Sequence, residues 1–500
     1  MFRIFGPPGT GKTTTLLNMV DKAMEEGISP NEIGFFAFTK KAANEAKERA
    51  TKRFKLNPEK DLPYFRTIHS LAYRMLSVKE HQMMSGEHYR ALSERIGFQL
   101  TASSNDEEST TFKHTDHPIL ALINLAKAKK QSLHRTYNQS DINFTWTEVQ
   151  YVADAYQNYK EAFGLIDFTD MLQKFIDEAH VFLPNFKLVF LDEAQDLSPL
   201  QWDIAHKLDE YSEKMYCAGD DDQAIYRWAG ADVDHFINLP GGAEVLEQSY
   251  RVPKAIHTVA SRISSRIKNR FPKVYRPREE EGNVFRTYDI SSIDMSKETW
   301  LIMAQANYML YPIEQVLKSN GYLYERQNSG RSIGEKMSIA INGWEALRKG
   351  RAVPTGTAQC IYGYMSGNGD KIKRGHKNIK APDEALLTMQ DLKDNFGLLA
   401  DESMIWHEAM DKIPEGDRAY ITALLRRGEK FNAQPRIRLS TIHGTKGGEA
   451  ENAVLMTDLT AAAMDQSGDD LHRVFYVGVT RASKNLYIVE PEDYMRAYDL

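Results

Sequence analysis

The sequence is poor in cysteine and has no long apolar run. Only two cysteines occur in 500 residues, Cys217 and Cys360, and neither has a Cys or His neighbour at metal-ligand spacing. This argues against a structural zinc site or redox chemistry and suits a reducing compartment. No stretch approaches the roughly 18 apolar residues of a membrane span, and no N-terminal run resembles a signal peptide. We therefore expect a cytosolic protein without membrane contact.

The sequence also has no excess of positive charge. Its 63 Lys and Arg residues are outnumbered by 69 Asp and Glu residues, which gives a formal net charge of −6. This excludes a globally basic, histone-like binder, so any contact to nucleic acid must come from a locally basic or aromatic-lined groove. With 42% apolar residues, a chain of this length should form two to four domains, because single cores stop growing at roughly 250–300 residues.

A phosphate-binding loop stands almost at the first residue. A short apolar run, residues 2–5, leads into Gly6-Pro7-Pro8-Gly9-Thr10-Gly11-Lys12-Thr13, which fits the pattern Gly, four residues, Gly-Lys-Ser/Thr. Backbone N–H groups of such a loop surround a β-phosphate, Lys12 reaches the β- and γ-oxygens, and the Thr13 hydroxyl binds Mg²⁺. A helix is expected from Thr14, which is counted with the site, to about Glu25. The alternative is a glycine-rich turn without a ligand, but strand, loop and helix follow in the order that an NTP site needs.

A second candidate element of the NTP site, an acidic pair, lies 180 positions beyond Lys12. The run Phe186–Leu191 has the character of a buried parallel strand and ends at Asp192 and Glu193. Asp192 would hold Mg²⁺, and Glu193 would orient and deprotonate an attacking water. The alternative is an acidic turn after a strand. Next, Ser198-Pro199-Leu200-Gln201 predicts a helix start with an N-cap and a capping box. The long spacing predicts a large insert between the two elements.

Eight sequence blocks carry a resemblance to a known family. They are Ala37–Ala43, Thr67–Ser70, Ile166–Asp170, Asp192–Asp196, Gly219–Trp228, Leu246–Arg251, Thr441–Gly447 and Tyr476–Ala482. In this order and spacing they resemble the motif set of UvrD/Rep/PcrA-type superfamily 1 DNA helicases, over nearly the whole chain. Any one block is a weak signal, whereas eight in order form a strong one.

The resemblance implies an α/β fold of two RecA-like P-loop NTPase parallel-sheet cores, 1A and 2A, each with an inserted, largely helical subdomain, 1B or 2B. The expected boundaries follow from where the motifs are absent. They are 1–80 and 156–255 for core 1A, 81–155 for 1B, 256–334 and 431–500 for core 2A, and 335–430 for a short 2B. The basic segment Ser366–Lys380 within 2B is either a solvated loop or a contact to duplex DNA.

The resemblance also assigns nucleotide contacts. Gln223 matches the residue that senses the γ-phosphate, and Arg251 and Arg481 match arginines that reach this phosphate from the opposite side. Arginine suits this role because its planar fork bonds two phosphate oxygens while it stays charged. The alternative for both arginines is a surface salt bridge. Tyr250 is expected to stack on adenine, and Glu449 is expected to touch the ribose.

The residues predicted to contact DNA are Phe38, Thr39, His69, Tyr226, Trp228, Thr441 and His443. Tyr226 and Trp228 alternate as in a strand or an extended loop, so both rings could stack on unpaired bases. Without the family, core packing would be the commoner role for such a pair. Thr39 is a candidate N-cap for a helix over 40–50, whose amides could meet a DNA phosphate. His69 is expected to close a strand end. His69 and His443 are assigned as DNA contacts by their place in motifs, and the alternative for each is a structural histidine.

The predicted function is an ATP-dependent DNA helicase that translocates 3′ to 5′ on single-stranded DNA and couples hydrolysis to duplex unwinding in replication, repair or recombination. Its partners would be single-stranded DNA, single/double-strand junctions, ATP with Mg²⁺ and unidentified replication or repair proteins. We expect a monomer in a bacterial or phage-infected host cytosol. Two alternatives stay open: a translocase that displaces proteins, and an ATP-gated DNA-binding or loading protein without unwinding.

One departure from the family concerns base recognition. Family members usually carry a Gln upstream of the phosphate loop that reads the adenine edge, whereas here only Met1–Phe5 precede Gly6. Recognition would then rest on stacking by Tyr250, which every base can satisfy. We expect other NTPs to support DNA-dependent hydrolysis within about tenfold of ATP.

Overall fold

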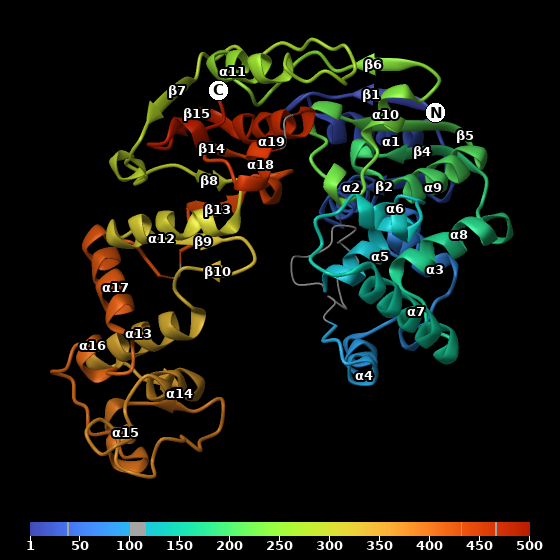
Figure 1. Cartoon of the computed structure of the whole chain (residues 1–500). Helices are drawn as coiled ribbons and strands as arrows, with labels where there is room; N and C mark the ends of the chain where they lie inside the picture. Colours follow the sequence, from blue (N-terminus) through green and yellow to red (C-terminus); the bar gives the residue numbers. More distant parts are fainter. Residues whose placement is uncertain (38–39, 101–116, 432, 466–467) are drawn as a thin grey trace. The chain divides into compact units, whose positions relative to one another are not determined.

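In the computed structural model the chain forms two compact units, each built on a parallel β-sheet (Figure 1). The structure describes residues 1–37, 40–100, 117–431, 433–465 and 468–500. The first unit comprises Met1–Glu280 with Gly468–Tyr476, and the second comprises Glu281–Ser467 with Val477–Leu500. Within the described residues, no helix is long and apolar enough to cross a membrane. The α/β fold with two parallel-sheet cores is confirmed, while the predicted boundaries of the cores and inserts stay predictions.

The sheet of the first unit has the strand order β3-β2-β4-β5-β1-β6, and each neighbouring pair is parallel. Its strands are β1 (Phe2–Phe5), β2 (Ile33–Ala37), β3 (Phe65–Thr67), β4 (Phe186–Leu191), β5 (Ser212–Gly219) and β6 (Ala243–Val245). The strands expected at 2–5 and 186–191 are therefore confirmed as β1 and β4.

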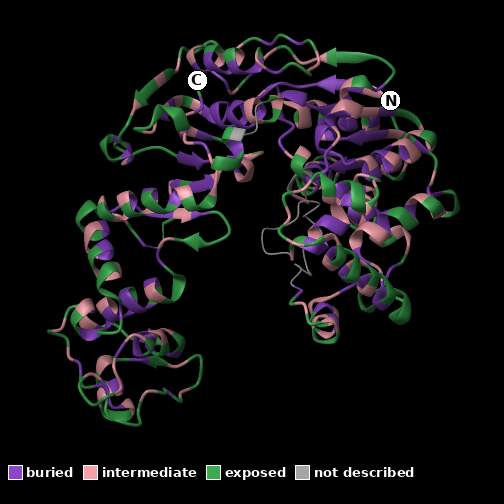
Figure 2. Ribbon diagram, viewed as in Figure 1, coloured by how far each residue is buried: buried purple, intermediate pink, exposed green. Residues whose placement is uncertain are grey.

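Helices cover both faces of this sheet, which explains why its strands read as apolar runs. Ile4, Phe35 and Phe190 pack in one cluster with α1 (Lys12–Glu25) and α2 (Lys40–Phe54). The next residue of each strand points to the opposite face, where a second cluster includes α3 (Ile68–Met75), α8 (Phe168–Phe182) and α9 (Pro199–Glu210). Strands β1 to β4 are buried along most of their length, β5 is buried mainly in its second half, and the edge strand β6 is largely exposed (Figure 2). The helices of this unit that follow β5 are α10 (Val233–Asn238) and α11 (Lys254–Ser264).

Local capping signals in the sequence are realised in these helices. The Ser198 hydroxyl accepts from the Gln201 N–H at the start of α9, Pro199 occupies the first helical position, and the capping box is complete. Gly11, in the left-handed region at φ 78°, is the N-cap of α1. The helix start predicted at Ser198 is confirmed, whereas α1 begins at Lys12, before the Thr14 that was expected.

A helical insert follows α3 in the first unit. Its helices α4 (Gly86–Ile96), α5 (Pro118–Ala128), α6 (Leu133–Asn138) and α7 (Trp146–Phe163) share a hydrophobic cluster of their own. Two lysines of the insert, Lys127 and the fully buried Lys160, form ion pairs with Asp167 and Asp170 at the start of α8. These pairs anchor the insert to the core. Residues 101–116 of the predicted insert lie outside the described residues.

The sheet of the second unit has the order β10-β9-β13-β8-β14-β15-β7. All neighbouring pairs are parallel except β10 and β9. The strands are β7 (Asn283–Thr287), β8 (Trp300–Ala304), β9 (Tyr324–Arg326), β10 (Gly330–Arg331), β13 (Ile437–Thr441), β14 (Ala450–Met456) and β15 (Ala482–Val489). Its flanking helices are α12 (Leu310–Ser319), α17 (Glu415–Arg427) and α18 (Ala461–Asp465), and α19 (Asp469–Val479) is divided between the units at Tyr476.

A small helical segment lies between β10 and α17. It consists of α13 (Glu335–Arg348), α14 (Thr355–Gly363), α15 (Met389–Phe396) and α16 (Trp406–Ala409), with a short antiparallel pair of β11 (Val353–Pro354) and β12 (Leu386–Leu387). Trp344 and Ile361 of this segment belong to the same hydrophobic cluster as Ile302 of β8. The segment is therefore continuous in packing with the second sheet.

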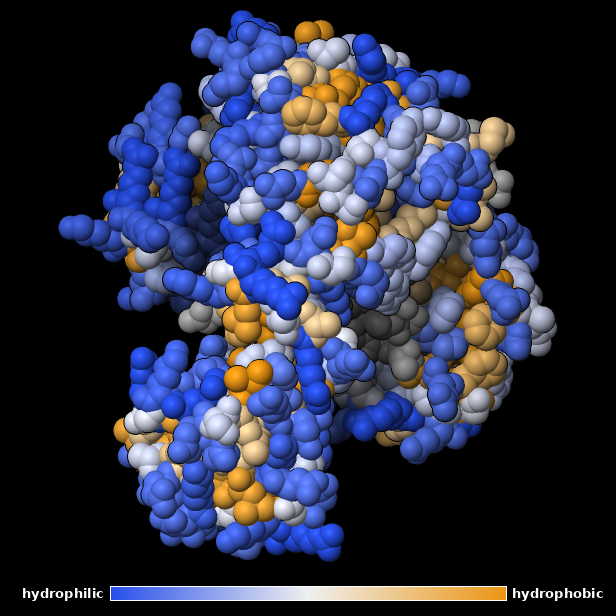
Figure 3. Space-filling model, turned by 90° about the vertical axis from the view of Figure 1, so that its left-hand side faces the viewer, coloured by the Kyte–Doolittle hydropathy of each residue, from blue (hydrophilic) through white to orange (hydrophobic). Residues whose placement is uncertain are grey.

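The face of the molecule in Figure 3 is mostly hydrophilic, with apolar side chains in separate small groups.

Candidate nucleotide-binding site

Three neighbouring strands of the first sheet deliver the predicted catalytic residues to one edge. β5 lies between β1 and β4, and all three run parallel. Because parallel strands end at the same edge, the segments that follow them come together there, as is typical for ligand sites in such sheets. These segments are Gly6–Thr13 after β1, Asp192-Glu193 after β4, and Asp220–Gln223 after β5.

The phosphate loop has the backbone that its glycines predict. Gly9 and Gly11 both have positive φ, 73° and 78°. A Cβ on Gly9 would lie 2.3 Å from the Cβ of Arg251, so a larger residue cannot fit without displacing that segment. Lys12 Nζ donates to the Gly6 carbonyl at 2.9 Å, which folds the side chain back over the loop. The Lys12 amine therefore lies next to the backbone of the loop, as expected for a lysine that binds phosphate there.

The two residues predicted to hold Mg²⁺ are in direct contact. The Thr13 hydroxyl donates to Asp192 Oδ2 at 2.6 Å. Burial and the neighbouring Glu193 raise the pKa of Asp192 to about 6, against the opposing effects of Thr13 and Lys12. A divalent cation at these oxygens would favour the ionised carboxylate. The pair fits Mg²⁺, which takes hard oxygen ligands and commonly only one or two from protein, the others coming from phosphate and water.

Glu193 adopts a left-handed backbone conformation, φ 56°, which non-glycine residues rarely do. The Gln195 side-chain amide donates to Glu193 Oε2 at 2.5 Å, and its carbonyl oxygen accepts from the Asp220 N–H at 2.9 Å. Gln195 is fully buried. It therefore links the predicted general base to the end of β5. Sequence reasoning missed this role, although Gln195 stands in the same block as Asp192 and Glu193.

Gln223 ends a 3-10 turn, Asp221–Gln223, directly after β5. Its amide donates to Asp220 Oδ2 at 2.6 Å. Asp220, Asp221 and Asp222 are all completely buried. The predicted γ-phosphate sensor thus stands on a buried acidic triplet that sequence reasoning did not single out.

The segment that carries Tyr250 and Arg251 packs on the phosphate loop. The Tyr250 N–H donates to the Gly9 carbonyl at 2.8 Å, and the Ser249 hydroxyl donates to the Pro8 carbonyl at 2.7 Å. The Tyr250 ring is largely exposed. The structure therefore brings both predicted nucleotide contacts next to the loop, with the aromatic face accessible.

The expected extended conformation of Tyr226 and Trp228 is wrong. Arg227–Ala229 forms a 3-10 turn, held by the Ala229 and Gly230 N–H groups on the Tyr226 and Arg227 carbonyls, and Gly230 follows in a left-handed conformation. Trp228 is 48% exposed, whereas Tyr226 is partly buried. Burial, with Asp196 and Glu193, raises the pKa of Tyr226. The two rings are therefore in different environments, and only Trp228 offers a broadly accessible face.

The other predicted DNA contacts are placed as follows. Phe38 and Thr39 lie outside the described residues, although α2 begins at Lys40 as expected. His69 does not close a strand; Thr67 ends β3 and caps α3, so His69 lies in the first helical turn, where burial lowers its pKa to about 4. In the second unit Thr441 ends β13 and accepts from the Gly444 N–H, and His443 begins a 3-10 turn. Their contact with DNA stays a prediction.

Two predicted nucleotide contacts belong to the second unit. Arg481 is 1% exposed. Its guanidinium donates to the carbonyls of Val477 and Gly448, at 3.0 and 3.1 Å. Glu449, the residue after Gly448, is exposed. Arg481 is thus a buried residue held next to the Glu449 turn, and the alternative of a surface arginine does not describe it.

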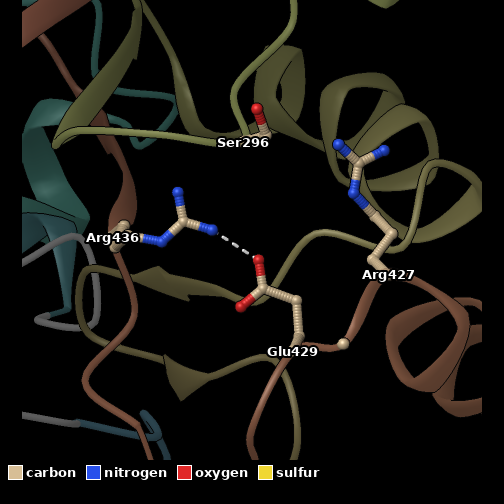
Figure 4. Close-up of a pocket in the computed structure, with 5 residues that line it drawn as sticks. Ser296, Arg427, Glu429 and Arg436 are labelled. Carbon is tan, nitrogen blue, oxygen red and sulfur yellow. Dashed lines mark hydrogen bonds and ion pairs between the residues drawn. The ribbon is translucent and has the colours of Figure 1, made fainter.

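The second unit also contains a cavity of about 520 Å³, lined by Ser296, Arg427, Gly428, Glu429 and Arg436 (Figure 4). Arg436 forms an ion pair with Glu429 at 2.5 Å, and the Arg427 guanidinium lies 4.0 Å from the centre of the Tyr322 ring. Arg436 also donates to the Met295 carbonyl at 3.2 Å, and Arg427 forms an ion pair with Asp294 at 3.5 Å, so both arginines contact the loop before β8. The cavity includes none of the predicted site residues.

Comparisons with known proteins agree with the motifs. Residues 2–241 match the UvrD/REP helicase N-terminal domain, and residues 436–489 match the UvrD-like helicase C-terminal domain. A probable DNA helicase II homolog of Rickettsia conorii is 27% identical over 63% of this chain and 48% of its own length. The ATP-dependent DNA helicase PcrA of Bacillus subtilis is 28% identical over 55% of this chain and 39% of its own length. DNA helicase II of Escherichia coli is 28% identical over 53% of this chain and 38% of its own length. The chain thus spans about half or less of the length of these relatives.

Proposed function

This chain belongs to the UvrD/REP helicase family, and we propose that it is an ATP-dependent DNA helicase that couples ATP hydrolysis to movement on single-stranded DNA and to duplex unwinding. One observation carries the proposal. The phosphate loop, the Thr13–Asp192 contact, Glu193 and Gln223 converge at one edge of the first sheet.

The residues support a division of roles in hydrolysis. The amides of the loop and Lys12 bind the phosphates, and Thr13 with Asp192 would hold Mg²⁺, which when bound neutralises phosphate charge. Glu193, held by Gln195, orients water and accepts its proton. Gln223 and Arg251 contact the γ-phosphate from the first core, and Arg481 contacts it from the second. Because the arginine of the second core acts only on bound nucleotide, hydrolysis would report closure of the cores.

DNA binding is proposed for the residues that follow the strands and turns of both cores. Trp228, with its accessible ring, would stack on unpaired bases, and Thr441 and His443 would contact the DNA backbone. We propose movement from 3′ to 5′, a role in replication, repair or recombination, and a cytosolic monomer as the working form. The protein-displacing translocase and the ATP-gated loading protein are the competing functions.

The test compares ATP hydrolysis with and without single-stranded DNA, alongside displacement of a labelled strand from a duplex. The proposal expects DNA to stimulate hydrolysis and ATP to drive displacement. Stimulated hydrolysis without displacement would favour the translocase, and tight ATP-dependent binding without stimulated turnover would favour the loading protein.

Lys12→Ala and Glu193→Gln are the matched variants for this test. Both should lose most ATPase activity while DNA affinity stays within severalfold of the parent, because the proposed DNA contacts lie elsewhere. Glu193→Gln should still bind ATP, since the phosphate loop is intact. Parent-like hydrolysis by either variant would show that the chemistry is assigned to the wrong residues.

A further inference from the structure

The acidic triplet Asp220–Asp222 is surrounded by cations from a distant segment of the first unit. Lys273, whose side chain is 1% exposed, lies with its Nζ 3.3 Å from Asp220, 2.5 Å from Asp221 and 2.8 Å from Asp222. Arg270 forms a two-pronged contact with Asp222, at 2.9 and 2.5 Å. Burying three adjacent carboxylates is expensive unless they are paired and hydrogen-bonded. The Arg270–Lys273 segment supplies that pairing.

Lys273 is the shared partner of all three carboxylates. Burial alone would lower its pKa, but Asp220, Asp222 and Asp221 outweigh burial and raise it, so the amine stays charged. The same carboxylate of Asp220 accepts from Lys273 through Oδ1 and from the Gln223 amide through Oδ2. The Asp220 N–H in turn binds Gln195, which holds Glu193. A continuous chain of contacts therefore runs from Lys273 to Gln223, the proposed γ-phosphate sensor, and to Glu193, the proposed general base.

The lysine-bearing segment is itself fixed to other parts of the site. The Phe271 ring stacks on Phe5, the last residue before the phosphate loop, with centroids 3.9 Å apart and planes 6° from parallel. The Phe271 N–H donates to Asp221. Arg473 of α19, fully buried, donates to the carbonyls of Asp221 and Asn269. The segment thus connects the end of β1, the acidic turn after β5 and the first half of α19.

We propose that Lys273 is a positioning residue of the ATPase site: by gathering Asp220, Asp221 and Asp222 around its amine, it holds Gln223 and Glu193 in the geometry needed for hydrolysis. The proposal rests on the proposed nucleotide site. The Lys273 amine pairs with Asp220, Asp221 and Asp222, none of which is assigned to ATP binding, so it is expected to act on turnover and not on ATP binding.

The experiment measures DNA-stimulated kcat, the KM for ATP and Tm for Lys273→Met, with active protein counted by titration with a fluorescent ATP analogue. The expected result is a kcat per binding site about tenfold or more below the parent with the KM for ATP within about threefold. Parent-like kcat per site in Lys273→Met would overturn the proposal.

Two further variants separate positioning from stability. Lys273→Met combined with Asp221→Asn restores the charge balance of the cluster, so its Tm should recover while kcat stays low; recovery of both would mean that the cluster only stabilises the fold. Lys160→Met removes another buried lysine of the same unit that pairs with two aspartates. It should lower Tm and leave kcat per site unchanged. An equal loss of kcat in Lys160→Met would overturn the specific role of Lys273.

Lys12→Ala, measured in parallel, distinguishes the two levels of failure. If Lys12→Ala hydrolyses ATP like the parent, the proposed function fails. If Lys12→Ala is inactive and the Lys273 variants are fully active, only the positioning role fails.

Discussion

At the scale of single residues, burial decides which polar side chains can act and how. Glu193 is held by Gln195 in a strained backbone conformation, and Asp192 receives a hydrogen bond from Thr13. Such strain is costly and persists where surrounding contacts enforce it, commonly at functional sites. In the phosphate loop, the absence of a side chain on Gly9 allows Arg251 to approach closely. Asp192 and Glu193 are therefore each held in place by a hydrogen bond from a neighbouring side chain.

His69 allows a prediction of pH dependence. Burial lowers its pKa from 6.5 to about 4. Between these two pH values His69 is therefore neutral in the folded protein and protonated in the unfolded chain. Its stabilising contribution is full above pH 6.5 and is lost as the pH falls towards 4, by about 3 kcal/mol in total. His69→Gln should remove this component. The measurement is the free energy of unfolding of parent and variant by urea at several pH values. A parent-minus-variant difference that does not change between pH 7 and 4 would contradict the shift.

At the scale of elements, short turns after strands carry most of the site. The segment from Asp220 to Gly230 forms two 3-10 turns in succession, Asp221–Gln223 and Arg227–Ala229. The first turn is buried and bears Gln223, and the second bears the exposed Trp228. One short stretch of chain therefore joins a residue proposed to sense phosphate to one proposed to bind a base, which gives a direct route between the two ligands.

Trp228→Ala tests this arrangement. Removing an aromatic ring that stacks on a base costs about 1–3 kcal/mol, so DNA-stimulated turnover and unwinding should fall together. The DNA-free ATPase and Tm should change little, because the ring is 48% exposed. The measurements are ATPase rates across DNA concentrations and thermal melting. Equal losses with and without DNA would instead make Trp228 a packing residue.

At the scale of the whole molecule, the two sheets carry complementary parts of the proposed motor. The first holds the phosphate loop, the acidic pair and Gln223, and the second holds Arg481, Thr441 and His443. Directional stepping needs two cores that grip DNA alternately as ATP is bound and hydrolysed. The division of motifs between the units is what such a cycle requires.

The sequences of the motifs Leu246–Arg251 and Tyr476–Arg481 resemble those of the 3′ to 5′ branch of the family, which predicts the direction of translocation on DNA. Duplexes with a 3′ single-stranded tail should be unwound, and those with only a 5′ tail should be unwound much more slowly, because the motor enters on the tail and moves towards the junction. Strand displacement on the two substrates measures this. A blunt duplex is the control, and preference for the 5′ tail would reverse the assignment.

Local features of the sequence were sufficient to predict the phosphate loop, a strand and a helix start. The loop Gly6–Thr13, the strand Phe186–Leu191 and the cap at Ser198 each follow from residues within a few positions of one another. The order of the motifs was sufficient to predict the family and the two-core fold, because each motif has its own chemistry and spacing. Periodicity failed at Tyr226 and Trp228, where hydrogen bonds and Gly230 wind the backbone into a turn that alternation of residues does not reveal.

Only the tertiary structure decided how distant segments meet. That β5 lies between β1 and β4 is a matter of strand pairing, which the strands' own composition does not specify. The contacts of Lys273 with Asp220–Asp222 and of Phe271 with Phe5 join residues far apart in the chain. Buried charges require partners, but the sequence does not state which cation will reach which carboxylate. Residue identity therefore determined the chemistry available to this protein, and long-range packing determined which groups stand together to perform it.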